Sequence, residues 1–246
     1  MKMKGKYGEI VRSDRTFDVI AAVLGCIIIV IVMVPLIFVA AASFSDPDLV
    51  IRGEVLLWPK GLTTKAYTMV FENKDIWRGF RNTMFYTALG TIISVTLTVL
   101  AAYPLSRKNL RGRNFIMMAV LFTMYFSGGM VPTYLLVKDL GMYNTIWAIL
   151  IPNALSTYNL IVAKTFFENS IPEELYESAR LDGCGNISML LRIVLPLSKA
   201  ILAVLVLYYA VAIWNSYFDA LIYLKDSSLH PLQIVLRNIL LLGQTE

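Results

Sequence analysis

"ELYESARLDGCGNISMLLRIVLP", residues 174–196, places a charged, glycine-interrupted segment directly before a long hydrophobic run. Pro172 suits the first position of a helix, because its missing N–H would have no partner there anyway. Glu174 and Glu177 follow in the first turns, where the helix dipole favours negative charge. Gly183 can take the left-handed conformation that ends many helices. The pattern therefore predicts a short helix of about three turns at 172–182.

The residues after this glycine predict a second helix. Asn186 is a suitable N-cap, since its side chain can accept a hydrogen bond from a free backbone N–H. The helix is expected to continue through Ile193 and Pro196 into the hydrophobic run that follows.

The short helix 172–182 is predicted to be amphipathic. Leu175, Tyr176 and Ala179 share a face at spacings of three and four, with glutamates beside them. From the residues alone, two alternatives remain open: a solvated helix on the membrane surface, or a helix inserted into a groove of a partner protein. The acidic residues favour the partner, because they are poorly placed against an anionic leaflet.

The composition is that of a membrane protein. Of the 246 residues, 57% are hydrophobic and only 16% are charged, whereas about 45–50% and about 25% are usual in soluble domains. A helix needs about 20 apolar residues to cross a bilayer. Runs of this length predict an all-α, polytopic helical bundle whose five spans lie at about 19–43, 82–105, 114–137, 140–163 and 194–218.

The distribution of lysine and arginine predicts the orientation. Basic residues gather in the segment 1–15 and in the link 107–113, so both are expected to be cytoplasmic. Residues 16–246 then form one membrane domain, and alternation places the loop 168–192 inside the cell. The first run is longer than the roughly 7–15 apolar residues of a signal peptide, which favours an uncleaved helix. Five is an odd number of spans, from which we expect a sixth to be missing from this sequence.

The opening stretch also carries a specific motif. Glu177-Ser178-Ala179, Gly183, Ile193 and Leu195-Pro196 stand at the spacing EAA-x3-G-x9-I-x-LP, with Ser178 in place of the first alanine. This resembles the EAA loop of binding-protein-dependent ABC importer permeases. "SGGMVPTYLLVKDLGMYNTIWAILIPNALSTYNLIVAKTFF" before it is similar to carbohydrate-type permeases, such as the smaller membrane subunit of the maltose importer. The similarity is greatest to the subgroup for complex polysaccharides and oligosaccharides.

The resemblance implies a fold, a function and a set of partners. The fold would be that of a type I ABC importer permease in a bacterial inner (cytoplasmic) membrane. The chain would form, with a second homologous permease, the path for a sugar or oligosaccharide delivered by an extracellular substrate-binding lipoprotein. Its EAA loop would dock on two ATP-binding subunits. The residues carried over to this coupling are Glu174, Leu175, Glu177, Ser178, Ala179, Asp182, Gly183, Ile193, Leu195 and Pro196.

Polar residues within the predicted spans are candidates for the substrate path, because such side chains usually face the bundle interior. They cluster in the fourth and fifth spans: Asn153, Ser156, Tyr158, Asn159, Tyr209 and Asn215. Amides and aromatic rings suit the hydroxyls and C–H faces of sugars. The same residue types also join helices or mark the membrane interface, so both interpretations remain open. "FSGGMVP", residues 126–132, is likewise either a helix break or a notch for close packing.

Other functional classes lack their residues in this sequence. There is no G-x4-GK-[ST] phosphate loop, so ATP hydrolysis is expected in a separate subunit and no cofactor in this chain. Cys26, Cys184 and His230 have no metal-ligand spacing, and the net charge of +5 is attributed to cytoplasmic loops rather than to nucleic-acid binding. A secondary transporter of small polar solutes is the alternative. It would need a carboxylate at mid-span, whereas Asp139 and Asp219 lie at span ends.

Overall fold

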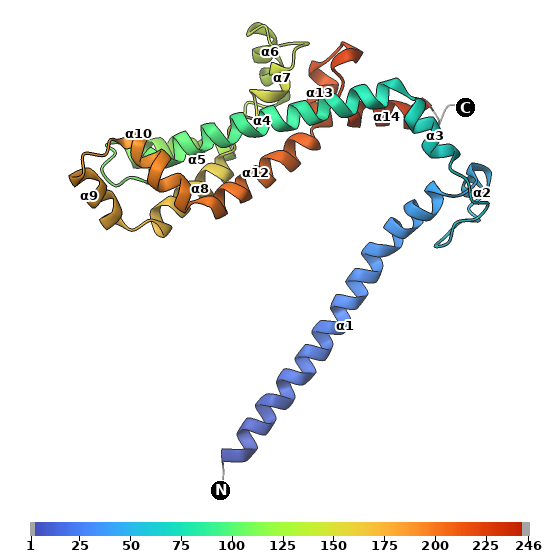
Figure 1. Ribbon diagram of the computed structural model, residues 1–246, viewed down its shortest axis with the longest axis horizontal. Coiled ribbons are helices and arrows are strands. Elements are labelled where there is room, and N and C mark those ends of the chain that lie inside the picture. Colours follow the sequence, from blue (N-terminus) through green and yellow to red (C-terminus); the bar gives the residue numbers. More distant parts are fainter. Residues whose placement is uncertain (1–2, 243–246) are drawn as a thin grey trace. The chain divides into compact units, whose positions relative to one another are not determined.

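The computed structural model describes residues 3–242, and every regular element within them is helical (Figure 1). The chain divides after Asn73 into two compact units. The first contains α1 (Met3–Ser43), α2 (Pro47–Ile51) and α3 (Lys65–Glu72). The second contains α4 (Lys74–Ser106), α5 (Arg113–Tyr125), α6 (Met130–Asp139), α7 (Trp147–Leu150), α8 (Thr157–Ser170), α9 (Glu173–Leu181), α10 (Asn186–Met189), the π-helix η1 (Leu190–Val194), α11 (Leu195–Leu197), α12 (Lys199–Trp214), α13 (Tyr217–Tyr223), the 3-10 helix η2 (Ser227–Leu229) and α14 (Leu232–Leu242).

From residue 19 to residue 39, α1 carries no charged residue and is apolar around its whole circumference. Every residue in this range is exposed except Gly25, which is partly exposed. In water such a surface would be strongly unfavourable, at about 25 cal/mol per Å² of apolar area. The predicted span 19–43 lies inside this helix, and the surface of the helix suits lipid as its surroundings.

The second unit is organised along α4, which runs beside α8, α12 and α14 (Figure 1). Small or hydroxylated residues recur along its buried side, most of them three or four positions from the next: Gly79, Thr83, Gly90, Thr91, Ser94, Thr98 and Ala102. Small side chains let the backbones of membrane helices approach closely. At Gly90 a Cβ atom would lie 2.8 Å from Ile213 Cδ1 and 3.0 Å from Leu150 Cδ2, so the helices meet most tightly there.

The predicted third span, 114–137, is two helices instead of one. α5 and α6 meet at an angle of 114° across residues 126–129. Gly129 has a φ of +85°, which side chains with a Cβ rarely adopt. "FSGGMVP" is therefore a helix break, and the packing-notch interpretation is wrong.

The fourth and fifth predicted spans also need correction. Residues 140–163 do not form one helix, because the turn at 151–156 separates α7 from α8, which continues to Ser170. Pro152 has no N–H to donate to a helix at this turn. The expected span 194–218 bends by 85° between α11 and α12, and α12 ends at Trp214. At the bend, Ser198 has non-helical backbone angles of φ −105° and ψ 21°.

By length and composition, two of the described helices could each cross a bilayer, within α1 and α4. The count rises to four if each bent pair forms one span. The difference from the five predicted spans has a physical reason. Mean hydropathy reports how apolar a run is on average. It does not report where glycine, proline or serine breaks the helix inside that run.

Candidate functional site

The predicted short helix is α9, and its ending is as predicted. Gly183 has a φ of +74°, and the N–H of Cys184 reaches back to the carbonyl of Ala179 at 2.8 Å. This is a left-handed glycine stop that satisfies carbonyls at the helix end. At the other end the prediction was off by one position: Pro172 is the N-cap, and Glu173 begins the helix.

The two faces of α9 differ from the prediction. Tyr176 and Ala179 are buried within the core of the second unit, among side chains of α4, α8 and α10. Leu175, expected on the same face, is 40% exposed. Leu175 is four residues before Ala179, so it lies at the edge of the buried face, while the motif residues Glu174, Glu177, Ser178 and Asp182 are exposed.

The exposed side of α9 has one further apolar residue. Leu181 is 89% exposed, and it continues the row of Glu174, Glu177 and Ser178 at helical spacing. The sequence prediction missed Leu181, although the same spacing argument would have placed it there. The free face of α9 is thus acidic with one large hydrophobic side chain at its end.

Arg107 anchors the buried side of α9. Its Nη2 donates to Glu173 Oε1 at 2.8 Å, and its guanidinium lies 3.3 Å from the centroid of the Tyr176 ring. Burial raises the pKa of Tyr176, and the nearby Arg107 lowers it. From the sequence, Arg107 was assigned only to topology. Its contact with α9 depends on the fold and has no local signal.

A second ion-pair group lies next to this anchor. Glu168 near the end of α8 accepts from Arg113 Nη1 at 2.7 Å and from Lys164 Nζ at 2.6 Å. Arg113 begins α5, so its pair with Glu168 joins α5 to α8, whereas Lys164 and Glu168 both lie in α8. The basic link and the loop 168–192 are therefore held together by charge at one end of the unit.

The motif residues after Gly183 lie on a broken helix. Gly185 is the cap of α10, and Asn186 is its first residue, which corrects the predicted Asn186 cap. Ile193 lies within the π-helix, half-buried, and Leu195 and Pro196 follow it in α11. The segment is therefore not continuous with α12, contrary to the prediction.

Four of the predicted path residues come together. Asn153, Ser156, Asn159 and Tyr209 line one cavity of about 410 Å³ between the α7–α8 turn and α12. The Tyr209 hydroxyl is 2.7 Å from Thr98 Oγ1 and accepts from the backbone N–H of Ser156 at 3.1 Å. These bonds fix the ring at the wall of the cavity.

The other two predicted path residues lie elsewhere. Tyr158 is 54% exposed, whereas its neighbour Asn159 in α8 is buried. Asn215 caps the end of α12, where its Nδ2 donates to the carbonyl of Val211 at 2.8 Å. Neither lines the cavity.

Asp219 is the residue that the sequence prediction passed over. It lines the same cavity and accepts from Asn153 Nδ2 at 2.9 Å. Both residues also line a second cavity of about 540 Å³, which reaches the Gly129 break. Asp219 is the charged residue common to both cavities, and no lysine or arginine is among the described residues that line them. Asp219 was not selected from the sequence because it lies near the end of a predicted span. In the structure the chain bends after α12, and Asp219 faces the cavity.

Comparisons with known proteins agree with this architecture. The profile of the family described as "Binding-protein-dependent transport system inner membrane component" matches residues 94–238. Protein LplC of Bacillus subtilis (strain 168) is 41% identical over 94% of this chain and 78% of its own length. The polygalacturonan/rhamnogalacturonan transport system permease protein YtcP of the same organism is 41% identical over 94% and 80%. A chain from the crystal structure of a bacterial ABC transporter involved in the import of the acidic polysaccharide alginate superposes with a TM-score of 0.87 at 36% identity, covering 92% of this chain and 81% of that one.

Proposed function

We propose, from the premise that this chain belongs to the family of binding-protein-dependent transport system inner membrane components, that it couples ATP hydrolysis by separate subunits to sugar import. The chain is a multi-pass cell-membrane permease of a sugar or oligosaccharide ABC importer. The resemblance inferred from its EAA-type motif is confirmed. The coupling residues, the partners in detail and the orientation belong to the proposal.

The proposed assembly follows the general plan of such importers. The chain pairs with a second homologous permease, and two ATP-binding subunits attach at the loop 168–192. An extracellular substrate-binding lipoprotein delivers the sugar. The amino terminus and this loop face the cytoplasm, as the basic segments 1–15 and 107–113 favour.

One observation carries the coupling proposal: α9 is anchored on one side and free on the other. Tyr176 and Ala179 are in the core, while Glu174, Glu177 and Leu181 are exposed. A docked ATPase subunit would grip the free face through charge-assisted contacts and one apolar side chain. Movement of α9 then reaches α4 directly through Arg107, as well as α10 through Gly183.

Gly183 gives a clean test of the second route. A Cβ atom at this position would meet nothing within 4 Å, so Gly183→Val introduces strain at φ +74° without a clash. That strain costs about 1–2 kcal/mol for a residue with a Cβ. We expect sugar uptake by the reconstituted importer to fall about tenfold, while ATP hydrolysis and membrane insertion persist.

Glu177→Gln tests the docked face in the same assay. Loss of the carboxylate should weaken co-purification of the ATPase subunit, whereas Glu72→Gln, which neutralises an exposed carboxylate of α3, should not. Uptake and co-purification equal to those of the unchanged protein in both Gly183→Val and Glu177→Gln would contradict the coupling proposal.

The cavity bounded by Asn153, Ser156, Asn159 and Tyr209 is proposed as this chain's share of the sugar path. Asn153→Ala and Tyr209→Phe should each reduce uptake, and Tyr158→Phe, on an exposed ring outside the cavity, serves as the control. Uptake that continues with an ATPase subunit unable to hydrolyse ATP would instead favour the secondary transporter, with Asp219 as its coupling carboxylate.

A further inference from the structure

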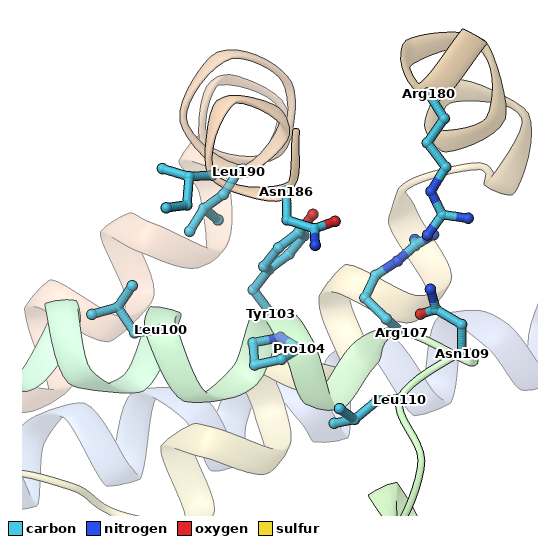
Figure 2. A pocket seen from close by; sticks show the side chains of 10 residues that line it. Leu100, Tyr103, Pro104, Arg107, Asn109, Leu110, Arg180, Asn186 and Leu190 are labelled. Carbon is cyan, nitrogen blue, oxygen red and sulfur yellow. The ribbon is translucent and has the colours of Figure 1, made fainter. Parts of the chain in front are cut away.

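A cavity of about 370 Å³ lies beside the coupling loop, separate from the proposed sugar path. Its walls come from the end of α4, the link that follows α4, α9 and the start of α10 and η1 (Figure 2). The described residues that form it include two arginines and no carboxylate. Of the residues that the proposed coupling and sugar path use, Arg107 is the one that also lines this cavity.

The two walls share one gradient of polarity. Leu100 and Tyr103 of α4 and Arg107, the first residue after α4, are spaced by three and four residues along one wall. The opposite wall presents Leu190 and Asn186 in the same order. Figure 2 shows Leu100 and Leu190 at one end, Tyr103 with Asn186 in the middle, and the arginines at the other end, with Leu110 below Arg107. Seven residues of helix rise about 10 Å, so the gradient extends over a length similar to a headgroup and the first part of its acyl chains.

The polar end carries an excess of positive charge. Arg107 and Arg180 both line the cavity at this end (Figure 2). Glu173 accepts from one nitrogen of Arg107, and Arg180 forms no ion pair with any described residue. A guanidinium has five N–H donors, and the ion pair with Glu173 uses one nitrogen of Arg107. A phosphate bound at this end would offset the excess positive charge and could accept bidentate hydrogen bonds from an arginine.

We propose that this cavity binds an anionic phospholipid, with its phosphate between Arg107 and Arg180 and its acyl chains against Leu100 and Leu190. The apolar wall favours a lipid over a free phosphate, because a small anion would leave that wall exposed to water. The inference rests on the proposed orientation, which places this end of α4 at the cytoplasmic leaflet, where anionic lipids attract basic side chains. The bound lipid would join α9 to α4 and so tune the coupling.

The test uses the intact importer, purified with its partner subunits and reconstituted in nanodiscs of phosphatidylcholine with or without phosphatidylglycerol. Native mass spectrometry counts the lipids that the complex retains. We expect phosphatidylglycerol to be retained over phosphatidylcholine, with about a tenfold loss of that preference in Arg180→Gln. Arg180→Lys should restore only part of it, since lysine keeps the charge and loses the planar fork. Arg111→Gln removes the same charge from the exposed link outside the cavity and should change nothing.

A second arm separates the two sources of phosphate. Inorganic phosphate is added to the importer in pure phosphatidylcholine, and thermal stability is measured for the unchanged protein and for Arg180→Gln. Stabilisation that depends on Arg180 would show a free anion as the ligand and overturn the lipid assignment. Equal retention of both lipids, or retention in Arg180→Gln equal to that of the unchanged protein, would also overturn it. Lipid retention is measured without a transport assay. The result can therefore be interpreted even if the sugar-import proposal fails.

Discussion

The two ends of α4 both hold another segment of the chain, and they do so by different chemistry. At one end Arg107 holds α9 through an ion pair and an aromatic ring. At the other end, three side chains of α4 bind backbone groups of residues 228–232. Asn82 donates to the carbonyls of Ser228 and His230 at 2.7 and 3.1 Å, and Tyr86 donates to the carbonyl of Leu229 at 2.8 Å.

The difference indicates which end is built to move. Bonds to backbone carbonyls fix the position of a segment, because they allow little change of geometry without leaving a polar group unpaired. Ion pairs between long side chains tolerate sliding, and they respond to salt and to nearby charges. The arginine end therefore suits a coupling element, and the backbone-bonded end suits a fixed support.

The largest effect is expected where the support depends on close approach. A Cβ atom at Gly79 would lie 3.1 Å from the Cα and 3.2 Å from the backbone nitrogen of Leu232. Gly79→Val must displace α14 and break the bond from Leu232 N–H to Thr83, so we expect the unfolding free energy in detergent to fall by about 2–3 kcal/mol. Gly25→Val, which meets nothing within 4 Å in α1, is the control. A loss no larger than that of the control would remove the distinction between the two ends.

Arg107→Gln should have the next largest effect on stability. It removes an ion pair and a cation–π contact at a residue that is 8% exposed, so we expect the unfolding free energy to fall by about 1–2 kcal/mol. Part of this loss should disappear at high salt, because the pair is partly screened. A double-mutant cycle with Glu173→Gln measures the ion-pair share, and a coupling energy near zero would leave Tyr176 as the main contact.

Tyr86→Phe is expected to cost about 1 kcal/mol, the net value of one hydrogen bond. In contrast to Arg107→Gln, the loss should be the same at low and high salt, since both partners are uncharged. Denaturation of each variant at two salt concentrations provides the comparison. A salt-dependent loss in Tyr86→Phe would argue against the assignment of the two ends.

The smallest effect concerns Asp226, which caps η2 next to the supported segment. A hydrogen bond from the backbone N–H of Ser228, 2.8 Å away, holds the pKa of Asp226 below its usual value. The stabilising contribution is therefore complete above the ordinary aspartate pKa of about 3.9 and is lost as the pH falls through the lowered value. Asp226→Asn should flatten this small acid dependence, which is checked by thermal unfolding between neutral and acidic pH. An unchanged slope would show that the cap contributes nothing.

Local signals in the sequence predicted α9 and its stop well. A proline, two early glutamates and a glycine at the end each act within one or two turns, so no distant contact was needed to interpret them. The helix break at Gly128 and Gly129 was visible for the same reason, although a packing role could not be excluded from residues alone. Hydropathy likewise located the long apolar segments.

Long-range contacts were beyond the same reasoning. Arg107 meets Tyr176 across 69 positions of sequence, and Asn153 meets Asp219 across 66. Leu175 was grouped with the buried Tyr176 and Ala179 and is 40% exposed, because spacing does not say how far burial extends around a helix. Tyr158 and Asn215 were grouped with the path residues by type, and the turn before α8 and the end of α12 direct them elsewhere.

The π-helix at residues 190–194 gives the motif spacing a geometrical meaning. Each residue of an α-helix turns the chain by about 100°, and a π-helical turn accommodates one more residue than an α-helical turn. The stretch between Gly183 and the Leu195-Pro196 pair therefore includes a residue that an uninterrupted α-helix would not need. Deleting one residue from 190–194 would regularise the helix and rotate the leucine and proline out of register. The fixed number of residues in the motif thus sets the rotation of Leu195 and Pro196 about the helix axis as well as their distance from Gly183.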